Sequence, residues 1–347
     1  MISNFDFAPQ FSIGSRRVGG DAPCFIIAEA GVAHFGDWDL ACQLVDSAAT
    51  AGADAFKTQF FDVEALIAAR ASEWRDRLRP RNLDFKQARA LKDRCESRGL
   101  AFMSTAHDET RISWLAELDV PAVKVGSGER NNPAFLEKLA ALSRPMIVST
   151  GMYTEADVEE AVAACRRGGC RALALLHCVT SYPAPDVDVN LRAMDRLRAL
   201  FDGPVGYSDH TPDHLAVLLA VGRGAKVVEK HITILRDVPN AHDWKVSAGP
   251  EDFSRLVANI RRAEAMLGSG EKVPAPSEQA GMSWALKSLV ARTNLPQGHV
   301  LSPDDLVAKR PGDGLPPTWA GKLVGRIVVR PIPADTPVTE KDLGPSS

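Results

Sequence analysis

The segment GPVGYSDHTPDHLAVLLAVGRGAKVVEKHIT, residues 203–233, carries the pattern that decides the fold. Two short apolar runs, 204–207 and 225–228, flank a stretch with apolar residues at helical spacing, which predicts a strand, a helix and a second strand. A right-handed crossover makes two such strands parallel neighbours. His210 and His231 come after the two runs, so we expect both at the same edge of one sheet.

Two imidazoles at adjacent strand ends can bind one divalent metal, because neighbouring strands lie only about 4.8 Å apart. Each histidine could instead pack locally or cap a loop, and these residues alone leave both interpretations open. Polar residues at the ends of the other predicted strands favour the interpretation of the two histidines as metal ligands.

The composition is typical of a globular protein with one large domain and a small one. The chain has 347 residues, of which 45% are hydrophobic and 24% charged, and its net charge is −3. The sequence has no basic segment that would predict binding to nucleic acid. We also expect neither a membrane span nor export, because no apolar run is long enough and no segment has the pattern of a leader. Six cysteines without a CxxC pair indicate reduced thiols. We therefore expect a cytoplasmic protein that binds its ligands in a pocket.

Alternating strand and helix patterns extend over most of the chain. The eight predicted strands are 24–28, 53–56, 100–103, 122–124, 145–148, 172–176, 204–207 and 225–228. Besides the helix within 203–233, the predicted helices are 40–51, 85–98, 110–118, 134–142, 155–167, 191–200 and 260–267. This count and length predict an α/β fold, a (β/α)₈ TIM barrel. A doubly wound open sheet is the alternative, but it usually has fewer strands and a Gly-rich first turn.

Polar residues occur at the end of every predicted strand. In chain order they are Glu29, Lys57 with Gln59, Thr105, Lys124 with Ser127, Ser149, Thr180 with Tyr182, Ser208 with His210, and Glu229 with His231. The active site of a barrel lies at the C-terminal ends of its strands, so we expect these side chains to form one site.

The residue types in this ring suggest a reaction. Lysines and hydroxyl groups together suit a small, highly charged anion such as a phosphate that also bears a carboxylate. Glu29 could move protons, and a metal at the two histidines could polarise a carbonyl. The pattern therefore suggests carbon–carbon bond formation between a phosphorylated enol and an aldehyde. A Schiff base formed by Lys124 or Lys57 is the alternative.

The C-terminal part of the sequence differs from the barrel in composition and in its predicted secondary structure. We predict a barrel domain over 1–268, a Gly-, Pro- and Ser-rich linker over 269–283 and a small β-rich module over 284–347. Segments 295–306 and 332–343 look like an internal duplication. Both end in a hydroxyl residue, two intervening residues, Asp and Leu, an arrangement that suits the capping of a short turn.

Ordered motifs along the chain resemble the signatures of the sialic acid (N-acetylneuraminate) synthase family. They are AEAGVAHFGD (28–37), GADAFKTQ (52–59), KVGSGE (124–129), STGM (149–152), YPAP (182–185), GYSDHT (206–211) and EKH (229–231). The C-terminal module is similar to the antifreeze-like (SAF) domain, with residues 309–312 matching its central turn. The resemblance covers about residues 25–343.

The resemblance implies a transferase, a phosphoenolpyruvate-dependent nonulosonate synthase. It would condense phosphoenolpyruvate with an open-chain N-acylated hexosamine similar to N-acetylmannosamine, giving a nine-carbon sugar acid and phosphate. His210 and His231 would hold the metal, Mn²⁺ with Mg²⁺ or Co²⁺ as alternatives. Glu29, Lys57 and Lys124 would be catalytic. The residues expected to bind phosphoenolpyruvate are Lys57, Thr105, Lys124, Ser127, Ser149, Thr180 and Ser208, and those expected to bind the acceptor are Gln59, Tyr182, Asp243 and Arg310.

The resemblance also implies a homodimer in which the C-terminal module is swapped onto the partner's barrel. Arg310 would then contact the acceptor in the neighbouring subunit's site. Such an exchange would explain how a module of about 60 residues, marginal by itself, is kept folded.

The chain departs from the family's pattern on the acceptor side. Ala33 and Phe35 stand where two side-chain amides are usual, and Thr180 stands where Asn is frequent. Segment 239–247 is one residue longer, so either Asp243 or His242 would bind the acceptor. We interpret this as the same reaction on an altered acceptor, one leading to a legionaminate-like or spore-coat-type sugar acid. A non-catalytic sugar- or ice-binding protein is the remaining alternative, and the retained Glu29 argues against it.

Overall fold

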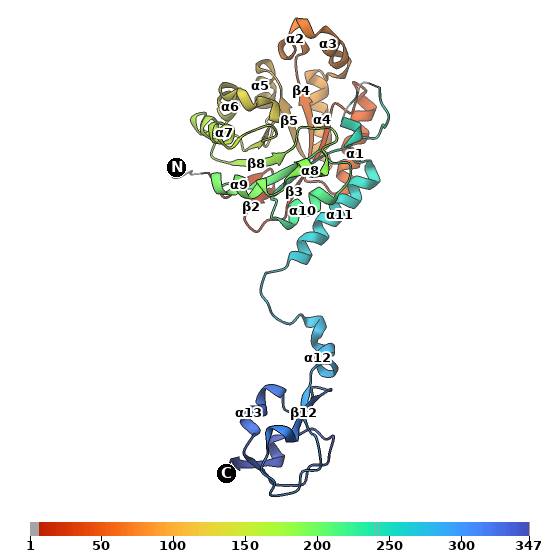
Figure 1. The fold of residues 1–347 in the computed structure, drawn as a ribbon. Coiled ribbons are helices and arrows are strands. Elements are labelled where there is room, and N and C mark those ends of the chain that lie inside the picture. Colours follow the sequence, from red (N-terminus) through yellow and green to blue (C-terminus); the bar gives the residue numbers. More distant parts are fainter. Residues whose placement is uncertain (1–6, 240, 242, 347) are drawn as a thin grey trace. The chain divides into compact units, whose positions relative to one another are not determined.

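The computed structural model describes residues 7–239, 241 and 243–346. The chain divides into two compact units, Met1–Gly268 and Ser269–Ser347 (Figure 1). None of the helices in this described part has the length and apolar character needed to cross a membrane.

The first unit is built around a closed barrel of eight parallel strands, which confirms the predicted fold. In order around the ring they are β10 (Val227–His231), β3 (Phe25–Gly31), β4 (Ala55–Phe60), β5 (Ala101–Ala106), β6 (Val123–Val125), β7 (Met146–Ser149), β8 (Leu173–Cys178) and β9 (Val205–Asp209). The last strand closes the ring on the first, with His231 opposite Glu29. Several predicted site residues lie within the strands rather than after them, because the strands extend further than the apolar runs.

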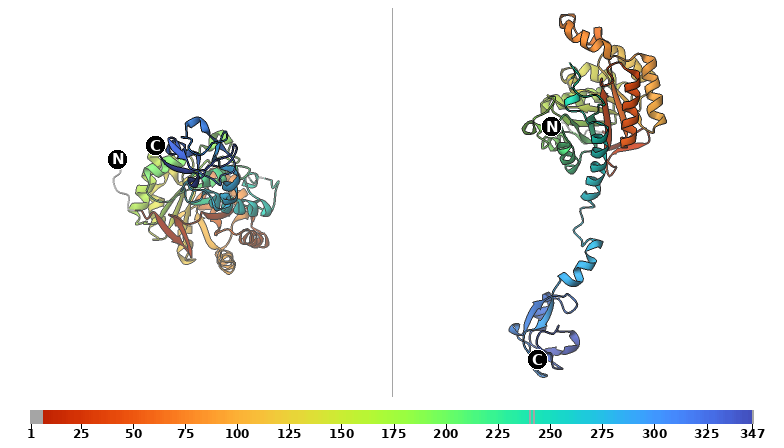
Figure 2. Two further views of the ribbon diagram at one scale, coloured as in Figure 1. Left: turned by 90° about the horizontal axis from the view of Figure 1, so that it is seen from below. Right: turned by 90° about the vertical axis from the view of Figure 1, so that its right-hand side faces the viewer.

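Helices surround the barrel, as Figures 1 and 2 show. They are α1 (Trp38–Ala51), α4 (Phe85–Ser97), α5 (Ile112–Glu117), α6 (Pro133–Ala140), α7 (Glu155–Arg167), α8 (Asp186–Val189), α9 (Ala193–Leu200), α10 (Leu215–Gly222) and α11 (Pro250–Leu267). The predicted helix 260–267 is only the second half of α11, which begins at Pro250 with acidic residues in its first turn. At α7 a side-chain cap marks the predicted start, because Thr154 and Asp157 form a capping box.

The residues before β3 form a hairpin, whereas the sequence suggested a polar lead-in. Strands β1 (Gln10–Ile13) and β2 (Arg16–Gly19) pair antiparallel. Ile13 and Val18 are fully buried and pack with the inward-facing residues at the start of the barrel strands, among them Phe25. The hairpin was missed because its two strands contribute only a few residues to the core, Ile13 and Val18 with Phe11 packed against them.

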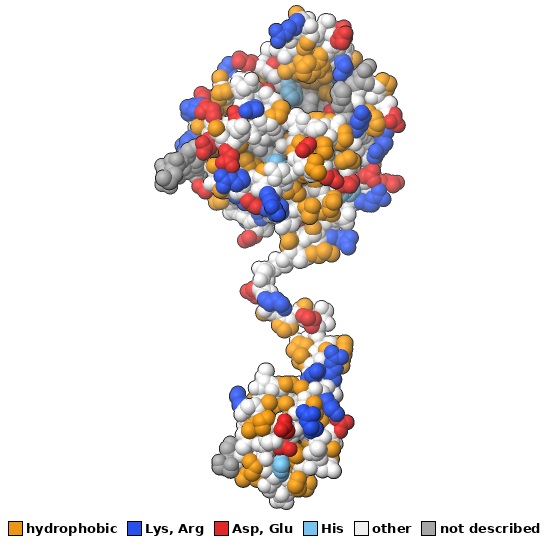
Figure 3. All heavy atoms as spheres, viewed as in Figure 1, with side chains coloured by type: hydrophobic (Ala, Val, Ile, Leu, Met, Phe, Trp, Pro, Cys, Tyr) orange, Lys and Arg blue, Asp and Glu red, His pale blue; other side chains and the backbone are white. Residues whose placement is uncertain are grey.

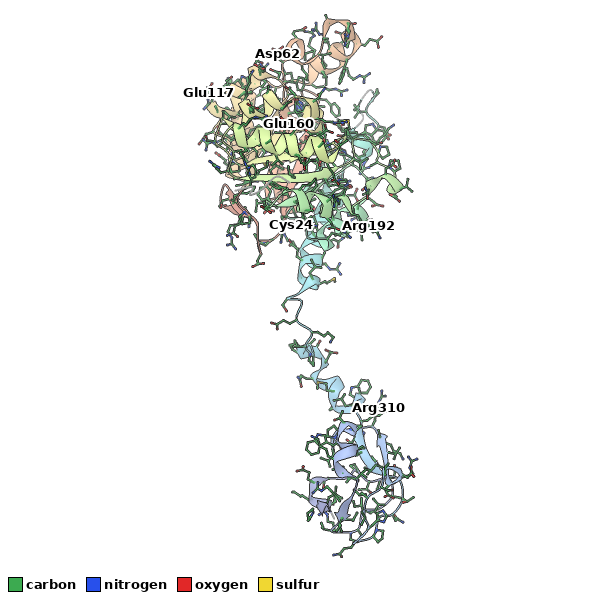
Figure 4. The ribbon with its side chains drawn as sticks, turned by 60° about the vertical axis from the view of Figure 1, so that its left-hand side comes forward. Cys24, Asp62, Glu117, Glu160, Arg192 and Arg310 are labelled. Atoms are coloured by element: carbon green, nitrogen blue, oxygen red, sulfur yellow. The ribbon has the colours of Figure 1, made fainter. Side chains whose placement is uncertain are left out.

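A second feature absent from the prediction is an insertion between β4 and α4. It contains α2 (Val63–Leu66), α3 (Ser72–Leu78) and two short 3₁₀ turns, Ala69–Ala71 and Arg79–Arg81. The insertion extends from the end of the barrel where the strands terminate (Figure 2). Asp62, the N-cap of α2, and Cys24, which precedes β3, accordingly lie at opposite ends of the barrel (Figure 4).

The second unit is small and β-rich, as predicted. It contains α12 (Gln279–Ala285), β11 (Ser288–Ala291) paired with β12 (Leu306–Lys309), α13 (Ala320–Leu323), and β13 (Arg326–Val328) paired with β14 (Leu343–Ser346). Its core is a separate cluster that includes Leu289, Leu301 and Val328. Figure 3 shows Lys and Arg side chains on the part of this unit next to α12.

Two sequence predictions for this unit have different outcomes. Ser302 with Asp305 and Thr339 with Asp342 cap short 3₁₀ turns, which confirms the predicted role of the duplicated motif. The predicted linker 269–283 stays a prediction; the structure places the start of α12 inside it. A hydrogen bond from the Ala275 N–H to Glu278 fixes the turn that leads into this helix.

Candidate active site

The inward-facing positions of the barrel change from apolar to polar along each strand. Ile27 is followed two residues later by Glu29, Ala55 by Lys57, and Met103 by Thr105. Side chains two residues apart on a strand point to the same side, so these polar groups extend into the barrel above an apolar core. They line a buried cavity of about 160 Å³, which we call the cradle. Its walls include Glu29, Lys57, Thr105, Lys124, Ser127, Ser149, Thr180, Ser208, His210, Glu229 and His231.

Two lysines and two glutamates form the charged centre of the cradle. Lys57 Nζ lies 2.8 Å from Glu29 Oε2 and 3.8 Å from Glu229 Oε2, and Lys124 Nζ lies 3.5 Å from Glu229 Oε1. All four side chains are at most 6% exposed. Burial acts to raise the pKa of Glu229, but Lys124 and Lys57 hold that pKa at about 2. Glu229 therefore remains charged between the two lysines.

Glu29 and Lys124 have pKa values moved toward neutrality. Burial raises the pKa of Glu29 to about 7, although Lys57 acts in the opposite direction. Burial likewise lowers the pKa of Lys124, although Glu229 opposes it. A carboxyl group that titrates near neutral pH is suited to accept and return a proton.

Hydroxyl groups surround the lysines. Lys124 Nζ donates to Ser149 Oγ at 2.8 Å, and Lys57 Nζ donates to Thr105 Oγ1 at 3.3 Å. Ser127 Oγ accepts from the Gly151 N–H at 2.9 Å. A Cβ on Gly151 would lie 2.3 Å from Thr180 Oγ1, so only glycine allows this close approach. The cradle thus gathers cations and hydroxyl donors in the arrangement expected for a small anion.

The two histidines lie next to each other at the rim of the cradle, as the opening segment predicted. Their ring centroids are 5.5 Å apart, and the Tyr182 ring lies 4.1 Å from that of His210. His210 Nδ1 bonds the Val179 carbonyl at 2.7 Å, which leaves its Nε2 lone pair available. His231 Nδ1 is buried and has no hydrogen-bond partner among the described residues. These donors fit a divalent metal, and burial lowers the pKa of His231, which favours the neutral, ligating form.

The protein supplies few other ligands at this point. Among the described residues no group of three or more His, Cys, Asp or Glu side chains is arranged to hold a metal. A metal held by His210 and His231 would therefore complete its coordination with water or substrate.

A larger cavity of about 490 Å³ adjoins the cradle, and we call it the outer cavity. The two share Gln59, Thr180, Tyr182 and His231 in their walls. The residues that line only the outer cavity are Val32, Ala33, Phe35, Trp74, Arg77, Leu78, Arg81, Ser181, Thr233, Ala241, Asp243 and Trp244.

Gly31 marks where the two cavities meet. A Cβ built on Gly31 would lie 3.5 Å from atoms of Asp243, Gln59 and Glu29, so these three predicted site residues converge on one point. Asp243 therefore lies at the junction of the two cavities, and its role in binding the acceptor stays a prediction. Its predicted alternative, His242, lies outside the described residues.

The structure brings together every predicted site residue of the first unit. Arg310 belongs to the second unit, where its guanidinium donates to the Ala285 carbonyl and lies over the Trp284 ring (Figure 4). The sequence reasoning gave Glu229 no role and missed the residues that the insertion contributes to the outer cavity. The position at a strand end, which singled out Glu29, also places Glu229 in the same ring, whereas nothing in the sequence of the insertion shows which side chains face inward.

Comparison with known proteins identifies the family. Residues 44–272 match the model of the NeuB family, and residues 287–344 match that of the SAF domain. The chain belongs to the NeuB family. It is 39% identical to the N,N'-diacetyllegionaminic acid synthase of Legionella pneumophila over 90% of this chain and 92% of that protein. It is 36% identical to the human N-acetylneuraminate-9-phosphate synthase over 94% of each chain.

A solved structure agrees with this assignment. The sialic acid synthetase of Leptospira borgpetersenii superposes with a TM-score of 0.74 at 34% identity, covering 79% of this chain and 95% of that one. The predicted family and enzyme class are thus confirmed: this NeuB-family member is an enzyme, a synthase of the transferase type. The roles assigned to single residues stay predictions.

Proposed function

We propose that this NeuB-family enzyme condenses phosphoenolpyruvate with an open-chain N-acylated hexosamine to give a nonulosonic acid and phosphate. The observation that carries the proposal is the buried cradle, in which Lys57 and Lys124 lie among hydroxyl groups beside a larger cavity. Phosphoenolpyruvate is a small anion with a phosphate and a carboxylate, which the cradle suits. The outer cavity has room for a sugar.

The proposed reaction follows from placing phosphoenolpyruvate in the cradle and the acceptor in the outer cavity. Lys57, Lys124 and the hydroxyls of the cradle hold phosphoenolpyruvate with its C3 toward the outer cavity. C3 bonds to the aldehyde carbon of the acceptor, whose oxygen takes up a proton. Water adds at C2 of the former phosphoenolpyruvate, and the C2–O bond to phosphate then breaks, leaving a 2-keto acid. Glu29, at the junction of the two cavities, receives and returns the protons.

We propose that a divalent metal, Mn²⁺ or else Mg²⁺ or Co²⁺, is bound by His210 and His231. Such an ion would polarise the aldehyde oxygen of the acceptor as a Lewis acid. The support is the pair of buried imidazoles with an available ring nitrogen on each.

Phosphate release tests the proposal. Metal-stripped enzyme is expected to release phosphate from phosphoenolpyruvate only when Mn²⁺ and an acceptor are both added. The acceptors are N-acetylmannosamine, its 6-phosphate, mannose and a 2,4-diacetamido-2,4,6-trideoxyhexose. Calorimetry measures phosphoenolpyruvate binding on the same samples. Folded enzyme that binds no phosphoenolpyruvate would contradict the proposed function.

A Schiff-base aldolase is the second candidate, because the lowered pKa of Lys124 would make its amine a better nucleophile. Borohydride reduction in the presence of substrate distinguishes the two reactions. A mass increase on Lys124 or Lys57 would favour the aldolase, whereas the synthase is expected to trap nothing.

We also propose a homodimer in which the C-terminal module of each subunit serves the partner's barrel. The support is the small separate core of this module and the exposed Trp284 and Leu286 at its start. In analytical ultracentrifugation we expect the dimer mass for the full chain. A monomer at micromolar concentration would contradict this.

A further inference from the structure

His107 is a residue of the cradle to which the proposed reaction gives no role. It directly follows β5, and its backbone N–H donates to the Phe60 carbonyl at 2.9 Å, which extends the pairing of β4 with β5. Its side chain lines the cradle and not the outer cavity. It also lies outside every motif that carries the family resemblance. What His107 can bind follows from the groups around its ring.

One ring nitrogen of His107 is enclosed but is not used within the protein. Nε2 is buried and has no hydrogen-bond partner among the described residues. A Cβ built on Gly126 would lie 3.9 Å from the adjacent Cε1, so this edge of the ring lies beside the Gly126 backbone. The carboxylate of Asp108 is engaged elsewhere, because it accepts from the N–H groups of Asp62 and Thr110. A buried polar atom without a partner costs free energy, so a ligand that supplies the partner gains affinity.

The His107 ring is neutral at physiological pH. Burial lowers its pKa to about 4, Lys57 and Lys124 act in the same direction, and Asp108 opposes them. A neutral imidazole carries one proton, which either ring nitrogen can hold. His107 is thus available as an uncharged N–H donor beside two cations.

The topology of the barrel separates His107 from the predicted metal-binding pair. In the ring of eight strands, β5 stands opposite β9, which leads into His210, and three places from β10, which ends in His231. In the described part of the chain, no three His, Cys, Asp or Glu side chains are arranged to hold a metal. The surroundings of His107 therefore favour an anionic ligand over a metal ion.

Positive charge alone does not account for anion binding in the cradle. Glu229 stays charged between Lys57 and Lys124, and Glu29 lies 2.8 Å from the Lys57 ammonium. The carboxylates therefore offset much of the charge of the lysines. A ligand that carries both a phosphate and a carboxylate also needs uncharged N–H and O–H donors.

We propose that His107 binds phosphoenolpyruvate by donating its Nε2–H to an anionic oxygen of the phosphate or of the carboxylate. The inference rests on the proposed function and adds a residue that sets the affinity for this substrate. Because His107 lines only the cradle, it contacts the substituents on C2 rather than C3, which faces the outer cavity. Both groups offer a neutral donor the same chemistry, an oxygen that carries negative charge.

Calorimetry with phosphoenolpyruvate and the full-length protein tests the assignment. His107→Leu removes the donor and should weaken phosphoenolpyruvate binding by about 10- to 100-fold, the loss expected for one hydrogen bond to a charged group. His107→Gln can place an amide N–H near the position of Nε2, so it should bind more tightly than the leucine variant. With saturating phosphoenolpyruvate, kcat should stay within about tenfold of the wild type, because a bond made equally in the ground and transition states affects KM.

The matched control is His177→Gln. His177 lies on β8, but its Nε2 already bonds the Val189 carbonyl at 2.7 Å, and it does not line the cradle. That variant should bind phosphoenolpyruvate as the wild type does. Urea unfolding separates binding from support of the fold: His107→Leu should unfold at or above the wild-type midpoint, because it removes a buried polar atom that has no partner among the described residues. A lower midpoint together with weaker binding would overturn the inference.

Competition shows which group of the substrate His107 binds. Inorganic phosphate and pyruvate carry one anionic group each, and each is titrated against phosphoenolpyruvate on the wild type and on His107→Leu. The competitor whose dissociation constant rises in the variant carries the group that His107 binds, whereas equal rises for both would indicate a general change in the cradle and overturn the inference.

Two further results would overturn it. One is unchanged phosphoenolpyruvate binding by His107→Leu, and the other is normal binding with a loss in kcat of more than tenfold, which would assign His107 to proton transfer. A wild-type enzyme that binds no phosphoenolpyruvate would instead contradict the proposed function.

Discussion

Replacing Lys230 with methionine is expected to lower the free energy of unfolding by about 3–5 kcal/mol, because it leaves a buried carboxylate without its cation. Lys230 Nζ donates to Asp209 Oδ2 and to the Thr211 carbonyl, each at 2.5 Å. The two side chains are 1% and 0% exposed. Asp209 and Lys230 each directly precede one of the predicted metal-binding histidines. The ion pair therefore joins β9 to β10 on the outward face of the barrel, whereas His210 and His231 point inward.

Urea unfolding followed by circular dichroism measures this effect. The control is Arg196→Met, which breaks an ion pair with Glu155 whose side chains are 64% and 54% exposed. We expect less than about 1 kcal/mol for that change, because exposed pairs are screened by water. A Lys230→Met protein with the wild-type urea midpoint would contradict the prediction. A variant recovered only as unfolded chain would agree with it.

The barrel and most of the cradle could be predicted from the sequence because both depend on short-range patterns. A buried parallel strand is a run of apolar residues, and the polar residue that ends it must lie at the active-site end of a barrel. Lys57 and Lys124 follow this rule. This rule does not predict that Glu229 lies between the two lysines, because that position depends on the register of three separate strands.

The outer cavity could not be predicted in the same way. Residues 75–81 read RDRLRPR, and no pattern in these letters separates Arg77 and Arg81, which line the outer cavity, from Arg75 and Arg79, which do not. The distinction arises from how Leu78 packs on the barrel and from the ion pairs that Arg75 and Arg79 form with Glu64. Helix α3 is also only seven residues long and has no side-chain cap, so its sequence signal is weak.

Replacing Glu29 with glutamine is expected to reduce the rate of phosphate release by about 10²- to 10⁴-fold, the usual contribution of a group that transfers protons. Glutamine has the same size and can keep contact with Gln59, whose Nε2 donates to Glu29 Oε1 at 3.2 Å. It cannot take up a proton, whereas the pKa of Glu29, raised by burial to about 7 against the effect of Lys57, allows that near neutral pH.

The variant should still bind phosphoenolpyruvate, because Lys57, Lys124 and the hydroxyls of the cradle remain in place. Calorimetry with phosphoenolpyruvate and an assay of phosphate release with Mn²⁺ and acceptor therefore separate binding from chemistry. The control is Glu160→Gln, which removes a carboxylate that is 54% exposed on α7 and should leave both measurements unchanged. If Glu29→Gln bound phosphoenolpyruvate normally and turned over within tenfold of the wild type, Glu29 would not be the group that transfers the protons. Water or the phosphate of the substrate itself would then have to do so.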